Sequence, residues 1–311
     1  MLSINGIETC KMLDAMMPFE AGEREHFKLS RINGDFEALR HMLYPSDSFD
    51  ITYLPVGAKK PLSVELPAET FEEIQKRIPA KVGVSPSAPY SFAIDKENDV
   101  AIMDFRHFED IEGMRVFADS MFTTLRKDGI GNLIIDVRRN GGGNSRVGDI
   151  LLRYISPIPF TQMDRSLIRI TPTTQRLRGN NDIPAQFTFY DIDEGHYLKP
   201  LTKEEGHYDG NVYLLTSNKT FSSAGSFSWA FKETGAGTVI GEETGGMNVC
   251  FGDILGYNLP VSGLYCTISY KRFWQFRADE NDIHGTLPDI AVPADKAMDE
   301  VMKLVKKHKH K

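Results

Sequence analysis

Two short motifs in this chain hold residue types that could carry out acyl transfer. The first, Asn140-Gly-Gly-Gly-Asn144, lies between an apolar run and a stretch with helical periodicity. Glycines let the backbone turn tightly and point several N–H groups into one space, where they could bind a phosphate or a developing oxyanion. The spacing matches neither the dinucleotide-binding nor the phosphate-loop pattern. Taken alone, this motif also fits a plain tight turn.

The second motif places two adjacent serines, Ser222 and Ser223, between an apolar run and a helical stretch. A serine at a strand-to-helix turn exposes its hydroxyl, and a helix N-terminus stabilises developing negative charge by roughly 0.3–1 kcal/mol. A serine that merely caps a helix is also common at this position. Because acyl transfer needs both a nucleophile and oxyanion donors, the two motifs together favour a serine-nucleophile site.

The elements around these motifs predict an α/β layered core. Continuous apolar runs, such as Leu133–Val137, indicate strands that are covered on both faces. A glycine, Gly129, lies just past a helical stretch as a C-cap. The expected strands are Val100–Phe105, Leu133–Val137, Val212–Thr216 and Val239–Gly241, and the expected helices are Met114–Leu125, one from about Ser145, and Ser222–Thr234.

The N-terminal part has a different pattern. Helical spacing over about Ala21–Leu43 is followed by two alternating stretches, Phe49–Leu54 and Leu62–Leu66, that predict a hairpin. A stretch rich in Pro, Gly and Ser at Pro79–Pro89 is typical of a linker. We therefore predict an α+β domain over residues 1–78 and a core domain over 79–311. Within the core, the polar region 160–210 forms either a flap over a cleft or a surface excursion.

Composition and charge exclude several classes of function. The net charge of −7 argues against nucleic acid as a partner, because that binding depends on Lys and Arg. No apolar run reaches the roughly 18 residues that span a bilayer, and no signal peptide is visible. Three dispersed cysteines suit neither a disulfide framework nor a zinc site. We expect no metal and no organic cofactor; the oligomeric state is left open.

The motifs together resemble the C-terminal processing (tail-specific) and tricorn-like serine peptidases, which have a crotonase-like (ClpP-like) core. The family pattern Asp-x-Arg-x-Asn-x-Gly-Gly is matched by Asp136–Gly143. Three later family patterns are also largely matched. Thr220–Gly225 matches the pattern around the nucleophile, Gly241–Gly246 the pattern after the following helix, and Gly285–Ile290 the pattern near the end. The segment Leu2–Glu8 is similar to the later half of the family's PDZ-like domain, which implies a partial PDZ-like domain and a piece of a longer protein.

The resemblance also implies roles for individual residues. Ser222 matches the nucleophile, and the N–H groups of Gly142 and Ser223 match the oxyanion donors. Ser223 is a competing nucleophile, although the register of the motif favours Ser222. Asp282 matches the supporting acid of the tricorn-like branch, and it also fits a surface turn.

Two positions depart from the family pattern. Met247 stands where the processing peptidases have their lysine base, so the usual Ser/Lys dyad is excluded. Gly225 replaces a glutamate. The tricorn-like branch uses a histidine upstream of the PDZ-like domain, and we expect that histidine to lie outside this chain. His284 could act as the base instead, or could be structural.

The leading hypothesis is therefore a serine-type endopeptidase of the tricorn-like branch that forms an acyl-enzyme on Ser222. Its substrates would be peptides or unfolded proteins. The alternative is an inactive homologue that binds peptides or apolar ligands, which the departures at Met247 and Gly225 motivate. Acyl-CoA chemistry on the crotonase-like core is a weaker third hypothesis. By resemblance, the protein is expected outside the cytoplasm, in the periplasm or secreted.

Overall fold

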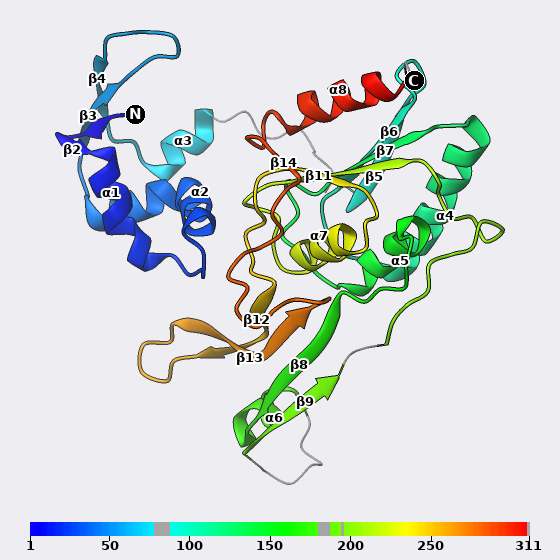
Figure 1. Ribbon diagram of the computed structural model, residues 1–311. Coiled ribbons are helices and arrows are strands. Elements are labelled where there is room, and N and C mark those ends of the chain that lie inside the picture. The colour runs from blue at the N-terminus through cyan, green and yellow to red at the C-terminus, as the bar shows by residue number, and fades with distance from the viewer. Residues whose placement is uncertain (78–87, 180–186, 194–195, 310–311) are drawn as a thin grey trace. The chain divides into compact units, whose positions relative to one another are not determined.

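Figure 1 shows the computed structural model, which describes the whole chain except residues 78–87, 180–186, 194–195 and 310–311. The chain forms two compact units, Met1–Ser87 and Ala88–Lys311. The predicted boundary at 78/79 and most of the predicted linker lie outside the described residues. Among those that are described, no helix is both long and apolar enough to cross a membrane.

The first unit is a small sheet with helices. Its four strands are ordered β2-β1-β3-β4 and pair antiparallel. The predicted hairpin is present as β3 and β4, and a short helix that the sequence analysis did not predict follows β2. The elements are β1 (Ser3–Ile4), β2 (Ile7–Glu8), α1 (Thr9–Met16), the 3₁₀ helix Met17–Phe19, α2 (Glu25–Leu43), β3 (Ser48–Tyr53), β4 (Leu62–Pro67) and α3 (Phe71–Arg77). The core of this unit is made of apolar side chains from β1, α1 and α2, such as Met16 and Ile32.

The second unit contains a six-stranded sheet of order β14-β11-β10-β7-β6-β5, parallel except for the β5–β6 pair. All four strands predicted for the core are present, as β6, β7, β10 and β11. The strands are β5 (Tyr90–Asp95), β6 (Val100–Phe105), β7 (Asn132–Asp136), β10 (Asn211–Thr216), β11 (Thr238–Gly241) and β14 (Ile290–Ala291), and the helices are α4 (Ile111–Asp128), α5 (Arg146–Ile155), α7 (Ser223–Glu233) and α8 (Ala297–Lys309). The predicted cap is confirmed, because Gly129 ends α4 in the left-handed conformation.

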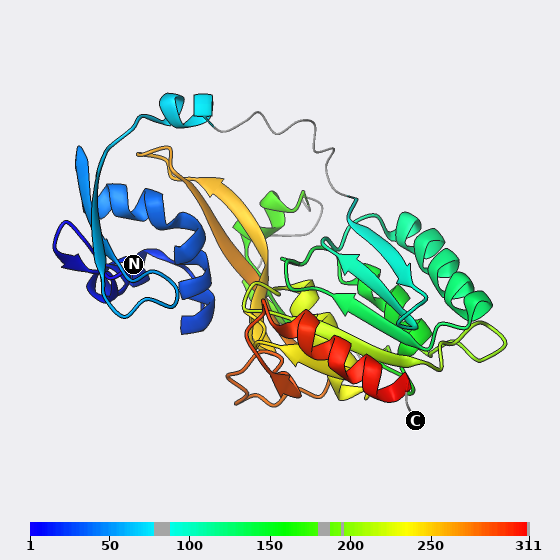
Figure 2. The same ribbon diagram turned by 90° about the horizontal axis from the view of Figure 1, so that it is seen from above.

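Helices cover both faces of this sheet. Helix α8 packs on one face, where side chains such as Val301 share a hydrophobic cluster with Ile134 of β7. Leu133 and Ile135 point to the opposite face and join the larger core formed with α4, α5 and α7. Figures 1 and 2 show the resulting three layers. Because alternate residues of a strand face opposite sides, a strand covered on both faces must be apolar throughout.

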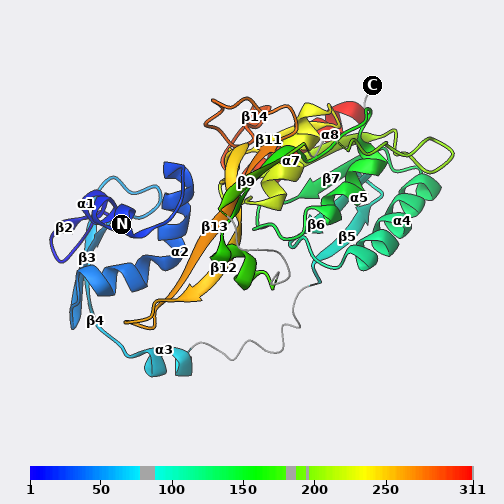
Figure 3. The same ribbon diagram turned by 90° about the horizontal axis from the view of Figure 1, so that it is seen from below.

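A second, antiparallel sheet extends from this core in the order β12-β13-β8-β9. The elements are β8 (Met163–Ile170), α6 (Pro172–Leu177), β9 (Thr188–Asp193), β12 (Val249–Asn258) and β13 (Tyr265–Gln275). Figure 3 shows the long β12–β13 hairpin projecting beyond the six-stranded sheet. Within the region 160–210, β8 and β9 belong to this sheet, and whether the region acts as a flap stays a prediction.

Candidate active site

The two sequence motifs lie side by side at the carboxyl ends of the adjacent parallel strands β7 and β10. Four hydrogen bonds join the loops that follow these strands. Ser217 Oγ donates to Arg138 O at 2.6 Å, and Thr220 Oγ1 donates to Val137 O at 2.9 Å. Two further bonds run from Phe221 N to Asn140 O and from Ser223 Oγ to Gly143 O. The glycine turn and the serine turn therefore form one structural unit.

Ser222 has the geometry of a presented nucleophile. It stands just before the first residue of α7, it is exposed, and its φ is +53° with ψ −128°. A non-glycine residue seldom adopts a positive φ, which costs of order 1–3 kcal/mol and is found mainly at functional sites. Within the described residues, its hydroxyl has no hydrogen-bond partner.

Ser223, in contrast, is buried, and its hydroxyl is occupied. Its side chain is 7% exposed, and its Oγ donates to Gly143 O at 2.5 Å. As the first residue of α7, it has an N–H without an intrahelical acceptor, and no acceptor for it exists in the part of the chain described. This arrangement suits a backbone donor better than a nucleophile.

Gly142 packs directly against the serine turn. A Cβ placed on Gly142 would lie 2.8 Å from Ser222 Cβ and from the backbone nitrogen of Ser223, and its φ is +101°. Only glycine fits here. In the structure the Gly142 N–H donates to Asn140 Oδ1 at 2.9 Å. It lies beside Ser222, and a bound oxyanion would compete with that amide oxygen.

Asn140 and the Asp136–Arg138 pair fix the glycine turn. Asn140 is fully buried, and its Nδ2 donates to Phe105 O at 2.9 Å. Arg138 binds the buried Asp136 through two hydrogen bonds of 2.9 and 2.6 Å and also donates to Ala294 O at 2.6 Å. The Asp136 carboxylate raises the pKa of Arg138. These polar residues of the first motif hold the turn in place.

The motif Gly241–Gly246 and the nearby Asn248 connect the serine turn to the segment that holds Asp282 and His284. Gly245 N donates to Thr220 O at 2.8 Å, and Asn248 N donates to His284 O at 2.9 Å. Asp282 accepts from the side chain of Asn248 and from the N–H of His284, both at 2.9 Å. The Asp282 carboxylate is therefore hydrogen-bonded within this loop, and its role as a supporting acid stays a prediction.

His284 is paired with an acid that the sequence analysis did not single out. Its Nδ1 lies 3.1 Å from Glu243 Oε1, and that same oxygen accepts from Gly285 N at 3.0 Å. Because a carboxylate can only accept, Nδ1 carries the proton, and the basic lone pair is then on Nε2. Glu243 lies in the motif Gly241–Gly246, so the sequence marked its neighbourhood, but nothing in the sequence links it to His284.

The structure also shows the surroundings of Met247 and Gly225, the two positions that depart from the family pattern. Met247 is half-buried immediately after Gly246, so no lysine occupies the position of the usual dyad base. A Cβ placed on Gly225 would meet Thr244 Oγ1 at 3.9 Å, which is an ordinary van der Waals contact. The described residues also contain no cluster of His, Cys, Asp and Glu side chains that could hold a metal ion.

The sheet with helices on both faces defines an α/β protein, and its serine turn braced by a glycine loop is an arrangement that a serine hydrolase requires. A sequence profile of peptidase family S41 matches residues 99–292. This chain belongs to peptidase family S41, the family of C-terminal processing and tricorn-like serine peptidases.

Solved structures of the family share this fold at low sequence identity. Mature CPAF is 15% identical with a TM-score of 0.62, and the match covers 98% of this chain and 75% of that one. The photosystem II D1 C-terminal processing protease is also 15% identical, with a TM-score of 0.42, covering 84% of this chain and 60% of that one. The match to mature CPAF confirms the predicted fold class, mixed α/β of the S41 type. The PDZ-like interpretation of the first unit stays a prediction.

Proposed function

We propose that this chain is a serine-type endopeptidase that cleaves peptides or unfolded proteins through an acyl-enzyme on Ser222. The observation that carries the proposal is the strained Ser222, held against Gly142 by hydrogen bonds between the two motifs. Strain of this kind is stabilised only where the surrounding structure fixes it. Membership of a peptidase family supports the same reaction class.

The chemical steps follow from these positions. Ser222 Oγ attacks the substrate carbonyl carbon as its proton passes to a base, and the carbonyl oxygen becomes an oxyanion. The N–H groups of Ser223 and Gly142 would stabilise that charge, each contributing roughly 3–4 kcal/mol in the transition state. The amine then leaves with a proton, and water hydrolyses the ester that remains on Ser222.

We propose His284 as the base available within this chain. It lies on the segment that hydrogen-bonds Asn248, next to the Gly245–Gly246 turn that contacts the serine loop. Glu243 fixes the ring tautomer that leaves Nε2 as the acceptor. His107 is a second histidine near the glycine turn, since the neighbouring Phe108 N donates to Gly142 O at 3.1 Å. A variant of His107 therefore serves as the control for the variant of His284.

The test is cleavage of a diverse peptide mixture, read by mass spectrometry, for the wild type and four variants. We expect Ser222→Ala to abolish cleavage and His284→Gln to reduce its rate by at least about a hundredfold, the usual contribution of a positioned base. Glu243→Gln should reduce the rate less, and His107→Gln should leave it unchanged.

Each outcome of this test has a distinct meaning. If Ser222→Ala still cleaves, the proposal is wrong. If His284→Gln cleaves at the wild-type rate while Ser222→Ala does not cleave, the base is another group, such as the histidine expected outside this chain. Binding of peptides without any cleavage would instead identify an inactive homologue.

We also propose, from the family resemblance, that the protein acts outside the cytoplasm. Detection of the full-length protein in the soluble cytoplasmic fraction of its source cells would contradict this placement.

A further inference from the structure

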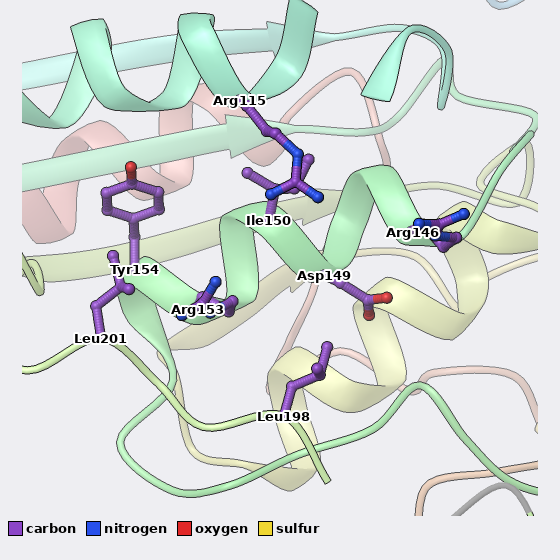
Figure 4. Close-up of a pocket in the computed structure, with 8 residues that line it drawn as sticks. All are labelled: Arg115, Arg146, Asp149, Ile150, Arg153, Tyr154, Leu198 and Leu201. Carbon is purple, nitrogen blue, oxygen red and sulfur yellow. The ribbon is translucent and has the colours of Figure 1, made fainter. Parts of the chain in front are cut away.

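A cavity of about 330 Å³ lies along α5, separate from the serine turn. Five of its residues come from α5 and lie between Arg146 and Tyr154. Arg115 of α4 closes one side, and Leu198 and Leu201 close the other. Figure 4 shows the side chains of α4 and α5 around this space. Spacings of three and four positions place these α5 residues on one side of the helix.

The charge of this cavity is positive, although the chain as a whole carries −7. Three arginines line it: Arg115, Arg146 and Arg153. Arg115 has an ion pair of 3.3 Å with Glu112, but both side chains are more than half exposed, so the pair is weak. In the described ranges, no carboxylate lies within 4 Å of the guanidinium groups of Arg146 and Arg153. Arg153 Nε donates to the backbone oxygen of Lys199 at 3.3 Å, so neither charge is paired with a carboxylate within the described residues.

Asp149 is the one acid of the lining, and its carboxylate is already engaged. Its Oδ1 accepts from Gln162 Nε2 at 2.7 Å, and the same amide donates to Ser145 O at 2.6 Å. Gln162 is 4% exposed, and its Oε1 has no hydrogen-bond partner in the described part of the chain. One negative charge against three positive charges leaves the cavity cationic.

The wall opposite α5 is fixed by backbone hydrogen bonds. Leu201 N donates to Arg153 O at 2.7 Å, and Leu198 exchanges two backbone bonds with Phe160 at 2.7 and 3.0 Å. Leu198, Leu201, Ile150 and the ring of Tyr154 give the cavity apolar surface beside its cations. A ligand that fills it would therefore need both an anionic group and an apolar body, which a bare phosphate lacks.

The cavity begins close to the candidate site. Arg146 is the first residue of α5, and only Asn144 and Ser145 separate it from the glycine turn that contacts Ser222. From Arg146 to Tyr154 the helix rises about 12 Å at 1.5 Å per residue. An extended peptide covers the same length with about three or four residues. A peptide held at Ser222 could thus reach along the cavity.

We propose that this cavity binds a carboxylate of the peptide substrate, either an Asp or Glu side chain or the C-terminal carboxylate, a few residues from the scissile bond. This inference rests on the proposed peptidase function and adds a substrate class to it. Arginine suits the role because its planar guanidinium binds a carboxylate through two parallel hydrogen bonds. The apolar wall would contact the neighbouring side chains of the peptide.

The test measures binding by calorimetry in the Ser222→Ala background, so that cleavage does not interfere. Four N-acetylated hexapeptides share the sequence Ala-Ala-Leu-Glu-Leu-Ala, with Glu or Gln in the fourth position and a free or amidated C-terminus. We expect the peptide with neither carboxylate to bind about tenfold more weakly than the best of the others, the scale of one charged hydrogen bond. Two of the peptides retain a single carboxylate, one on the Glu side chain and one at the C-terminus. Comparing their affinities shows which of the two carboxylates the cavity binds.

The matched variants replace arginines by glutamine. Arg146→Gln with Arg153→Gln should weaken binding of the acidic peptides about tenfold and leave the neutral peptide unaffected. Arg169→Gln, at an exposed residue of β8, is the control and should change nothing.

Equal binding of all four peptides, unchanged binding in the double variant, or no binding of any peptide would overturn the proposal. Cleavage by the wild type without any preference for acidic peptides would overturn this inference alone. Carboxylate-dependent binding without cleavage would overturn the peptidase proposal alone.

Discussion

Ser223 Oγ donates a hydrogen bond of 2.5 Å to the carbonyl oxygen of Gly143, and this bond joins the start of α7 to the glycine turn after β7. It separates the roles of two adjacent serines. Ser223 is buried and its hydroxyl is hydrogen-bonded, whereas Ser222 is exposed and is held at a positive φ. The tertiary contact therefore supports the assignment of Ser222 as the nucleophile more directly than the motif register does.

Replacement of Ser223 should weaken this contact without removing the nucleophile. We expect Ser223→Ala to lower the free energy of unfolding by about 1 kcal/mol, the usual contribution of one hydrogen bond. A fluorophosphonate probe should still label the variant, more slowly than the wild type. Urea unfolding and labelling followed by peptide mapping measure both effects. Labelling lost in Ser223→Ala but kept in Ser222→Ala would reverse the two roles.

A side chain at Gly142 should disable the site. Its Cβ would lie 2.8 Å from Phe221 O, Ser222 Cβ and Ser223 N, and its φ of +101° is strained for any other residue. We expect Gly142→Ala to reduce peptide cleavage by at least about a hundredfold, as the loss of one oxyanion donor does. Gly141→Ala is the control, because nothing lies within 4 Å of a Cβ at Gly141. Equal rates in the two variants would contradict this account of the turn.

Arg138 and Arg139 are neighbours with very different expected contributions to stability. Arg138 is paired with the buried Asp136 and bonded to Ala294 O, so Arg138→Gln leaves a buried carboxylate without its cation. We expect a loss of about 3–5 kcal/mol in the free energy of unfolding. Arg139 is more than half exposed and lies 3.6 Å from Asp104, so Arg139→Gln should change stability by less than about 1 kcal/mol. Urea unfolding of the two variants, side by side, measures the difference.

The Asp149 carboxyl should make stability depend on pH. Burial raises its pKa, and the hydrogen bond from Gln162 and the charge of Arg146 only partly oppose this. A raised pKa means that the folded state binds more protons than the unfolded state, so this group's contribution to stability falls as the pH rises from about 4 through the folded pKa.

Asp149→Asn removes that titration and keeps an oxygen for Gln162. We expect the variant to gain stability relative to the wild type as the pH is raised from about 4 to about 7. Urea unfolding at several pH values tests this. A stability difference that is constant across that range would show that Asp149 has an ordinary pKa.

Much of the core could be predicted from the chain alone, because its signals are local. The apolar run Leu133–Val137 identified a strand covered on both faces, and Gly129 marked the end of α4. The helix α1 was not predicted, because its eight residues have too few turns for a clear periodicity. In the region 160–210, β8 pairs with β13, which lies about a hundred residues later, so no local pattern could place it.

Residue types and short spacings predicted the family, four of the six strands of the main sheet, the helices α4, α5 and α7, and the two motifs that hold Ser222 and Gly142. The chain carries these signals locally. Contacts in the folded chain were needed to show that Ser223 is bound to Gly143, that Glu243 is paired with His284, and that the arginines of α4 and α5 line one cavity. Those relationships join residues that are distant in the chain, and packing of the sheet and its helices brings them within contact distance.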